Sequence, residues 1–364
     1  MVKKEKKSGI KILIIILILL IICAGVLFAF KVFNTPKAEE TQNQNIQEPE
    51  QQPIEEEKPI TIYQGDDRPI AVMIDNHDGA RPQAGLNDAY IVYEIIVEGG
   101  YTRLMPVYKG VDLDKIGPIR SARHYFIDYA LENDAIYVHY GWSPQAQSDI
   151  SKFDVDNING IFESSSNFWR VKDKYAPHNV VTTTEKILKI AERKEYKTKS
   201  NKESVLNYVS DEVLLEDGQD AIEVVIPYST SQEVSFEYNE DTKKYEKYAN
   251  GEKQEDWGTD EVVATKNIII TFADNYSLND GSGKGRQDLE NVGTCDGYYI
   301  TNGKAIKIKC EKQSRTAQTV YKDLEGKEIE VNDGNTFIQI CPIDADVEII
   351  APETENTNTN TTNQ

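Results

Sequence analysis

Hydrophobic positions in the first half of the chain follow two different periods. Short apolar or β-branched runs predict strands at residues 69–75, 89–97, 101–108 and 135–140. Apolar residues three or four positions apart predict helices at residues 117–133, from Ser143-Pro144 onward, and at 183–193. The glycines at 99 and 100 join two of the strands in a predicted hairpin. This mixed order of strands and helices predicts an α/β or α+β domain.

The pattern after about residue 215 is one of strands. Alternating or β-branched runs predict strands at residues 222–226, 233–238, 244–248, 261–272 and 336–341, and a hairpin at 298–308. Turn-forming pairs ending in glycine stand at residues 250–251, 302–303 and 333–334. The polar, glycine-rich stretch 273–293 predicts a long loop or a disordered insert. We therefore expect a smaller, mainly antiparallel, β-rich second domain.

An unbroken apolar run from Ile12 to Phe30 follows a cluster of lysines at the N-terminus. At 1.5 Å per residue, a helix of this length spans the roughly 30 Å hydrocarbon core of a membrane. Lysines on its N-terminal side favour a cytoplasmic N-terminus. A cleaved signal peptide is the alternative, but no small-x-small pattern follows Phe30. We expect an uncleaved, single-pass anchor in the cell membrane, with the main domains outside the cytoplasm.

These patterns divide the chain into six segments. We expect a cytoplasmic basic segment at 1–11, a transmembrane anchor at 12–30, a disordered linker at 31–60, an α/β domain at 61–212, a β-rich domain at 213–351 and a disordered tail at 352–364. The linker is rich in Glu, Gln, Asn and Pro and has almost no large apolar residues, which is typical of disorder.

Composition narrows the classes of function. The chain carries 61 acidic and 40 basic residues, a formal net charge of −21, so its surface repels nucleic acid. It contains no HExxH, Cys-x-x-Cys, nucleophile-elbow or phosphate-loop motif in a suitable context. We therefore expect no nucleic-acid partner, no cofactor and no metal site.

Two of the four cysteines are predicted to meet across a hairpin. Counting outward from the Asn302-Gly303 turn places Cys295 opposite Cys310. The register makes them a hydrogen-bonded pair with Cα atoms about 5.5 Å apart. A disulfide and two buried thiols both remain open.

The stretch from Gly117 to Arg123, Gly-Pro-Ile-Arg-Ser-Ala-Arg, holds the most informative residues. Proline is favoured at the first position of a helix, so the motif predicts a helix start. Arg120 and Arg123 would then share the first turn, where the helix dipole favours acidic residues instead. Two cations at the N-terminal end of a helix require a nearby anion, which is either a protein carboxylate or a bound ligand.

The predicted hairpin at Gly99-Gly100 adds candidate counterions. A two-residue turn places Glu98 opposite Tyr101, Ile96 opposite Arg103 and Glu94 opposite Met105. The two glutamates then share one face with Arg103, as a structural ion-pair network or as the polar floor of a cleft. The Cα atoms of Glu94 and Glu98 would lie about 13 Å apart. Because glycosidase carboxylates lie within about 9.5 Å of each other, a partner such as Asp75 or Asp88 stays open.

Six blocks in the first half together resemble the YerB-like bacterial envelope proteins, a family of unknown function. The blocks are RPIAVMIDNH (68–77), ARPQAGL (80–86), IVYEIIVEGGYTR (91–103), GPIRSAR (117–123), YVHYGWSPQA (137–146) and APHN (176–179). Weaker likeness continues through 293–312 and 334–340. The resemblance implies an extracytoplasmic α/β-type domain followed by a smaller β-rich domain. Members are commonly predicted lipoproteins, from which this chain departs because Ile21 and Ile22 precede Cys23 where small residues are expected.

The resemblance transfers no mechanism, so three functional hypotheses rest on the residues. The leading one is a non-catalytic binding or regulatory module that holds an anionic ligand, either a cell-wall component or an acidic segment of an envelope protein, because guanidinium groups match carboxylate and phosphate. Its expected site residues are Arg120, Arg123, Arg103, Asn76, Arg81, His139, Ser143 and His178.

The second hypothesis is a cell-wall hydrolase or transferase that uses Glu94 or Glu98 with Asp75 or His139 for acid–base catalysis. The third is that these polar residues form a purely structural network and that the function lies on a part of the surface that no sequence motif marks. We expect a binding role rather than an enzyme.

Overall fold

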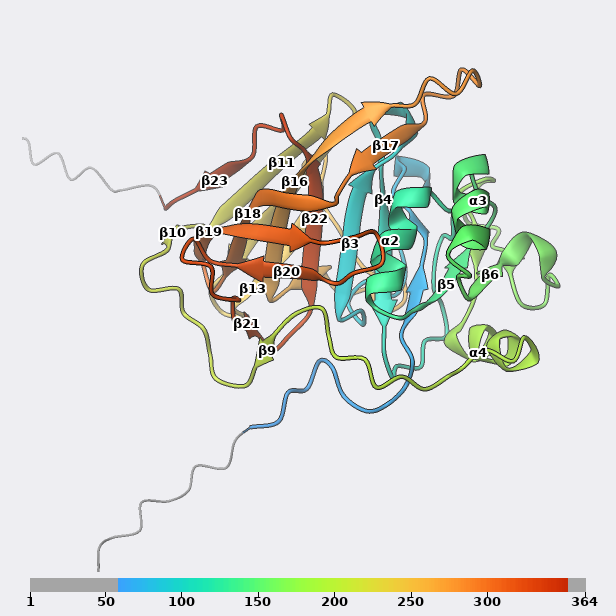
Figure 1. Ribbon diagram of the computed structural model, residues 1–364, viewed down its shortest axis with the longest axis horizontal. Helices are drawn as coiled ribbons and strands as arrows, with labels where there is room; N and C mark the ends of the chain where they lie inside the picture. Colours follow the sequence, from blue (N-terminus) through green and yellow to red (C-terminus); the bar gives the residue numbers. More distant parts are fainter. Residues whose placement is uncertain (1–57, 353–364) are drawn as a thin grey trace, which may run out of the picture. The chain divides into compact units, whose positions relative to one another are not determined.

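A thirteen-stranded sheet runs through both halves of the chain in the computed structural model, which describes residues 58–352 (Figure 1). The predicted basic segment, membrane anchor, nearly all of the linker and nearly all of the tail lie outside these residues. None of the helices within 58–352 has the length and apolar character needed to cross a membrane.

The first half contributes six strands to this sheet, the only three α-helices of the described residues, and one small ribbon. The sheet strands are β1 (Ile70–Val72), β2 (Ile74–Asp75), β3 (Ile91–Ile96), β4 (Thr102–Tyr108), β5 (Ile136–His139) and β6 (Asn157–Asn159). The helices are α2 (His124–Glu132), α3 (Pro144–Lys152) and α4 (Thr184–Arg193). The ribbon pairs β7 (Trp169–Arg170) with β8 (Val180–Val181). Ser143 and Thr183 cap α3 and α4 through their hydroxyl groups, which confirms the predicted helix starts there.

The second half is built of strands. Seven of them join the large sheet: β10 (Gln219–Asp220), β16 (Asn267–Ser277), β17 (Gln287–Glu290), β18 (Gly293–Thr301), β19 (Lys304–Lys312), β20 (Thr319–Lys322) and β22 (Thr336–Pro342). A six-stranded sheet holds β11 (Glu223–Ser229), β12 (Gln232–Asn239), β13 (Lys244–Ala249), β14 (Glu252–Lys253), β15 (Ala264–Thr265) and β23 (Glu348–Ile350). A parallel ribbon pairs β9 (Tyr208–Val209) with β21 (Val331–Asn332).

The two halves meet inside the large sheet. Strand β22 pairs in parallel with β16 on one side and with β3 on the other, so a strand from the end of the chain lies beside one from its beginning (Figure 1). Phe337 lies opposite Val92 in this register. The described chain is therefore mainly β, with helices added to a sheet that both halves share.

The central strands are buried on both faces, which explains their near-continuous apolar sequences. One face packs against apolar residues of α2 and α3, such as Phe126 and Ile150. The other packs against α4 and the six-stranded sheet, through residues such as Ile187 and Phe236. The sheet is thus the middle of three layers.

The predicted helix over 117–133 is only half correct, because α2 begins at His124. The preceding residues are extended and bond to segments on both sides: Arg120 N donates to Met73 O (2.8 Å) and Ile119 N donates to Val180 O (2.7 Å). The Gly117–Pro118 peptide is cis, and a Cβ at residue 117 would lie 2.7 Å from Val180 O. The glycine therefore permits a close backbone approach and does not mark a helix start.

The predicted register of the first hairpin is wrong by one residue. The connection contains a 3-10 turn at Glu98–Gly100 and is closed by Val97 N donating to Tyr101 O (2.7 Å). Consequently Arg103 pairs with Ile95, and Glu94 pairs with Leu104. Because side chains alternate along a strand, a one-residue shift moves Glu94 and Arg103 to opposite faces of the sheet.

The stretch 273–293, predicted as a loop or a disordered insert, is a β arm at its two ends with a loop at 278–286 between them. Strand β16 continues to Ser277, where β17 pairs with it antiparallel, from Asp274 opposite Glu290 to Ser277 opposite Gln287. The arm projects beyond the body of the large sheet (Figure 1). Its polar residues give no apolar alternation, so sequence periodicity could not reveal these strands.

Two of the three predicted glycine turns join hairpins, whereas the strands on either side of Asp333-Gly334, β21 and β22, do not pair with each other. Asn250-Gly251 and Asn302-Gly303 adopt positive φ angles of 52° and 76°, and of 50° and 73°, as the predicted two-residue turns require. Cys295 lies opposite Cys310, as counted from the second turn, and both thiols are free in this structure.

A buried ion pair joins the two sheets beside β3. Glu94 is fully buried and accepts hydrogen bonds from Asn76 Nδ2 (2.9 Å) and Thr102 Oγ1 (2.7 Å). Its second oxygen lies 3.3 Å from Nζ of Lys247, on β13, which is also buried. The register of β3 thus turns this carboxylate toward the second sheet, where Lys247 is its ion-pair partner.

Replacing Lys247 with Met should lower the free energy of unfolding by about 3–5 kcal/mol, because it leaves the Glu94 carboxylate buried without its cation. Urea unfolding followed by circular dichroism measures the loss. Lys253→Met is the matched control: it removes a 44% exposed partner of Glu246 and should cost less than about 1 kcal/mol. Equal losses in the two variants would contradict the assignment.

Candidate functional site

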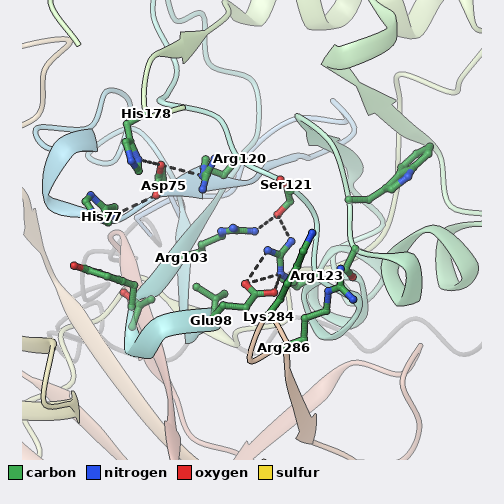
Figure 2. A pocket seen from close by; sticks show the side chains of 15 residues that line it. Asp75, His77, Glu98, Arg103, Arg120, Ser121, Arg123, His178, Lys284 and Arg286 are labelled. Carbon is green, nitrogen blue, oxygen red and sulfur yellow. Dashed lines mark hydrogen bonds and ion pairs between the residues drawn. The ribbon is translucent and has the colours of Figure 1, made fainter. Parts of the chain in front are cut away.

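A cleft of about 390 Å³ lies where β2, β4 and β5 meet the segment that leads into α2 (Figure 2). Five cationic side chains line it: Arg103, Arg120, Arg123, Lys284 and Arg286. Two carboxylates, Asp75 and Glu98, and two histidines, His77 and His178, share the same walls. This local excess of positive charge stands in a chain whose net charge is −21.

Backbone pairing brings these side chains together. Asp75 ends β2 directly opposite Arg103 on β4. The extended segment 118–123 is held between two strand ends, with Arg120 N bonded to Met73 O (2.8 Å) and Ala122 N bonded to Gly141 O (2.9 Å). Residues after β1, β2 and β5 therefore converge at the carboxyl ends of neighbouring parallel strands, which is where α/β sheets commonly bind ligands.

The carboxylate of Glu98 forms an ion pair with the guanidinium group of Arg123. The pair is bidentate, with Nε to Oε1 at 2.8 Å and Nη2 to Oε2 at 2.7 Å. Burial alone would raise the pKa of Glu98, but the hydrogen bonds and charge of Arg123, helped by the charge of Arg103, outweigh it and hold that pKa below its usual value. Arg123 is thus neutralised within the protein.

Arg103 has no such partner. Its side chain is 4% exposed, its guanidinium donates to the carbonyl oxygen of Ser121, and no carboxylate of the described residues forms an ion pair with it. Burial, followed by the neighbouring charges of Arg123 and Arg120, lowers the pKa of Arg103 to about 9. The group therefore remains a buried cation at neutral pH, and an anion beside it would offset the cost of its burial.

Arg120 is only partly neutralised. Its Nε lies 3.0 Å from Asp75 Oδ2, yet the contact is not aligned as a hydrogen bond. None of the described residues bonds to its two Nη groups, and the side chain is 25% exposed in the cleft. Arg120 can therefore offer a guanidinium edge to a ligand.

The two histidines form a stacked pair beside Asp75. Their rings lie 4.4 Å apart with an interplanar angle of 19°. His178 Nδ1 lies 2.6 Å from Asp75 Oδ2, and Gly79 N donates to His77 Nδ1 at 3.0 Å. Each ring is thereby oriented by a partner at Nδ1, as is common for functional histidines.

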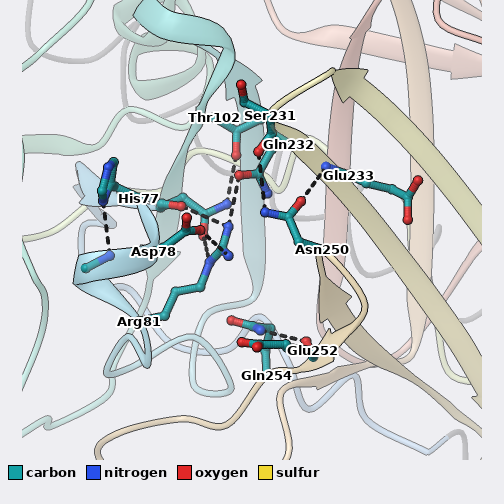
Figure 3. A network of polar contacts seen from close by, with 12 residues as sticks. His77, Asp78, Arg81, Thr102, Ser231, Gln232, Glu233, Asn250, Glu252 and Gln254 are labelled. Atoms are coloured by element: carbon teal, nitrogen blue, oxygen red, sulfur yellow. Dashed lines mark hydrogen bonds and ion pairs between the residues drawn. The ribbon is translucent and has the colours of Figure 1, made fainter.

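The structure separates the predicted site residues into two groups. Asp75, Glu98, Arg103, Arg120, Arg123, Ser143 and His178 line the cleft, whereas Glu94, Asn76, Arg81 and His139 do not. Asn76 donates to Glu94, and Arg81 bonds to Asp78 (2.8 Å) and to Gln232 of the second sheet (2.9 Å; Figure 3). Asn76 and Arg81 therefore belong to the contacts between the large sheet and the six-stranded sheet, outside the cleft.

His139 is enclosed below the cleft rather than within it. Burial, partly opposed by contacts with Gly141 O and Asn157, lowers the pKa of His139 to about 4, so its ring is neutral at pH 7. Ser143 lines the cleft, but its hydroxyl oxygen accepts from Ala146 N (3.1 Å) as the cap of α3. No cluster of three metal-ligating side chains occurs within residues 58–352.

The helix start that suggested an anion site at Arg120 and Arg123 is wrong, although both arginines line the cleft. Arg120 precedes α2 by four residues and Arg123 is the extended residue at its N-cap, so neither lies in a helical first turn. The predicted site omitted eight of the residues that line the cleft, among them one imidazole, His77, and two cations, Lys284 and Arg286. His77 stands in the DNH block at a strand end, which was a usable signal, whereas only the β16–β17 pairing brings Lys284 and Arg286 to the cleft.

The chain belongs to a family of two-part proteins described only as proteins of unknown function. The model "Protein of unknown function (DUF3048) N-terminal domain" matches residues 58–197, and its C-terminal counterpart matches residues 224–338. A relative from Bacillus subtilis (strain 168), "Putative lipoprotein YerB", is 34% identical over 286 residues, covering 76% of this chain and 81% of the relative. The predicted resemblance to YerB-like proteins is thereby confirmed.

A solved structure agrees with this assignment. The crystal structure of YerB protein from Bacillus subtilis matches with a TM-score of 0.68 and 31% identity, covering 78% of this chain and 94% of that one. The two-part, mainly β architecture is therefore shared with that protein.

Replacing Arg123 with Gln should lower the free energy of unfolding at pH 7 by about 1–3 kcal/mol, because Glu98 loses its bidentate partner. An unfolded glutamate has a pKa of about 4.3, and the pKa of Glu98 in the folded protein is lower than the usual value. The stabilisation is therefore complete above about pH 5 and disappears as the pH falls through the lowered pKa of Glu98.

Urea unfolding of wild type and Arg123→Gln between pH 7 and pH 3 measures this effect, with Lys189→Gln as a control because that lysine forms an exposed pair with Glu185. The control should change little at any pH. A difference between Arg123→Gln and wild type that stays constant with pH would refute the assigned ion pair.

Proposed function

We propose that this protein is a membrane-associated, extracytoplasmic binding protein of the bacterial envelope, and that its cleft holds an anionic ligand of the cell wall. The observation that carries the proposal is Arg103, a guanidinium buried in the cleft wall without an ion-pair partner among the described carboxylates. Beside it, Arg120 keeps its two Nη groups unbonded. Guanidinium groups whose N–H donors are not used by protein carboxylates can bind the oxygens of a phosphate or carboxylate.

The envelope location draws on sequence and on family. The apolar run 12–30 behind a lysine cluster supports attachment to the membrane with the described residues outside the cytoplasm. A relative that covers three quarters of this chain is named a lipoprotein, which supports the same compartment by another means of attachment. A cationic cleft in an acidic protein would select anions locally while the remaining surface repels them.

Of the residues considered for catalysis, Glu94 or Glu98 with Asp75 or His139, only Glu98 and Asp75 line the cleft. Glu94 is fully buried between the sheets and bonded to Lys247 and Asn76, while Glu98 is held by Arg123. A substrate in the cleft would therefore contact one of these carboxylates and not the other.

Cations from the arm extend the site beyond a single anion. Lys284 and Arg286 come from the second half of the chain and line the outer part of the cleft. Arg286 pairs with Asp280, but no acidic side chain of the described residues pairs with Lys284. A ligand with several linked anionic groups could contact Arg103 and Arg120 with one group and Lys284 with another, which favours an anionic polymer.

Inorganic phosphate is a direct probe of the inner cleft. Arg120→Gln should weaken orthophosphate binding by about tenfold to 100-fold, because it removes a charge-assisted hydrogen-bond donor worth about 1.5–3 kcal/mol. Isothermal titration calorimetry at low salt measures the affinity. Arg193→Gln, on α4 and away from the cleft, should bind like wild type. Unchanged binding in Arg120→Gln, or equal weakening in both variants, would overturn the proposed site.

Tripolyphosphate probes the arm. Lys284→Gln should weaken tripolyphosphate binding about threefold and leave orthophosphate binding unchanged, because an exposed lysine contributes up to about 1 kcal/mol to an ion pair. Competition between the two anions on wild type and variant distinguishes these effects, and Lys189→Gln serves as the exposed control. A loss that is equal for the two anions would show that the arm does not bind a second anionic group.

A further inference from the structure

His178 has the surroundings of a proton acceptor. It lines the cleft from the loop before β8, with its side chain 19% exposed. Its Nδ1 is held at 2.6 Å by Asp75, a carboxylate that is 4% exposed. A carboxylate at Nδ1 places the ring proton there in the neutral tautomer, which leaves Nε2 as the basic nitrogen. No side chain of the described residues hydrogen-bonds to Nε2.

Asp75 is itself held in place. Its Oδ1 accepts from the backbone N of His77 (3.2 Å), while its Oδ2 faces both His178 and Arg120. The residue also pairs with Arg103 across β2 and β4. The Asp75 carboxylate therefore faces both the imidazole of His178 and the guanidinium group of Arg120, and Arg103 lines the same cleft from the neighbouring strand. A base and an anion site thus share one cleft.

The hydroxyl groups of Thr102, Ser121 and Ser143 line the cleft, but none of them is hydrogen-bonded to this base. Among the described residues, no hydroxyl or thiol hydrogen-bonds to His178, and the Ser143 hydroxyl is occupied by the backbone of α3. The cysteines within residues 58–352 lie on β18, β19 and β22 and do not line the cleft. Water is then the nucleophile that an imidazole in this position can activate.

The cations specify which bond the water would attack. Phosphoryl transfer is catalysed mainly by positioning and by fixed positive charge around the phosphoryl oxygens. Arg103 and Arg120 provide that charge beside the base, whereas ester or amide hydrolysis would need a pair of donors aimed at one carbonyl oxygen. The combination of guanidinium groups and an oriented histidine therefore fits a phosphoric ester.

We propose that the cleft hydrolyses phosphoric esters, with His178 as the general base and Asp75 as its positioning residue. This proposal rests on the proposed anion site and adds an activity to it. As a water oxygen forms its bond to phosphorus, one water proton moves to His178 Nε2. The bond from phosphorus to the ester oxygen breaks, and that oxygen leaves with the bonding electrons and takes a proton from solvent. His178 then returns its proton to solvent, so one water is consumed and nothing is oxidised or reduced.

The purified full chain is assayed with bis(p-nitrophenyl) phosphate and p-nitrophenyl phosphate, which distinguish a diesterase from a monoesterase. His178→Gln should lower kcat on the accepted ester by about 100-fold or more, the contribution expected of a general base. Orthophosphate binding to the same variant should stay within about twofold of wild type, which shows that the cleft is intact.

Asp75→Asn tests the positioning role separately. It should lower kcat with little change in KM, and it should not weaken orthophosphate binding, because a negative charge is removed from the anion site. A merely structural Asp75 would instead weaken orthophosphate binding and turnover together. Arg193→Gln, purified in parallel, should keep wild-type turnover, and a loss confined to the His178→Gln and Asp75→Asn preparations then excludes a contaminating phosphatase.

Each remaining outcome is decisive. Absence of turnover on the two esters, with orthophosphate still bound, would overturn the catalytic proposal and leave the binding function standing. Unchanged turnover in His178→Gln would remove His178 as the base. Failure of wild type to bind orthophosphate at all would instead refute the anion site on which the activity rests.

Discussion

The register of β3 against β4 is the constraint on which the rest of the site depends. With Ile95 opposite Arg103, the arginine points to the face that carries α2 and Glu94 points to the face of the second sheet. Each charge then meets a different environment: Glu94 contacts Lys247 between the sheets, whereas Arg103 lines the cleft and forms no ion pair with a carboxylate of residues 58–352. One residue more in the Glu98–Gly100 turn than a tight hairpin requires decides this separation.

The three arginines of the cleft differ in how far protein groups neutralise their charge. Arg123 is paired with Glu98, Arg120 shares Asp75 with His178, and Arg103 donates to the carbonyl oxygen of Ser121 with no ion-pair partner in the described part of the chain. A structural network would use up its guanidinium groups, because buried charges are costly without partners. The residual positive charge concentrates where the strand ends open to solvent, and this supports a ligand rather than a purely structural role.

Both halves of the chain are needed for this arrangement. Strand β22 inserts beside β3 and fixes the large sheet across the two family domains, while the arm formed by β16 and β17 brings Lys284 and Arg286 to a cleft whose floor belongs to the first half. The second domain therefore completes the site as well as covering the first. The order of strands and helices in the first half does not indicate that the cleft needs residues from the second half.

Sequence alone determined the local features: strand periods at residues 69–75 and 101–108, the caps of α3 and α4, the Asn-Gly turns, the opposition of Cys295 and Cys310, and the family. It also singled out Arg103, Arg120, Arg123 and His178. Only the tertiary structure decided that 117–123 is extended, that Glu94 leaves the site and that the arm joins it. These outcomes depend on hydrogen bonds between segments far apart in sequence, such as Ile119 N to Val180 O. Local propensity reports a residue's near neighbours, whereas the pairing of distant backbone groups selects the face to which each side chain points.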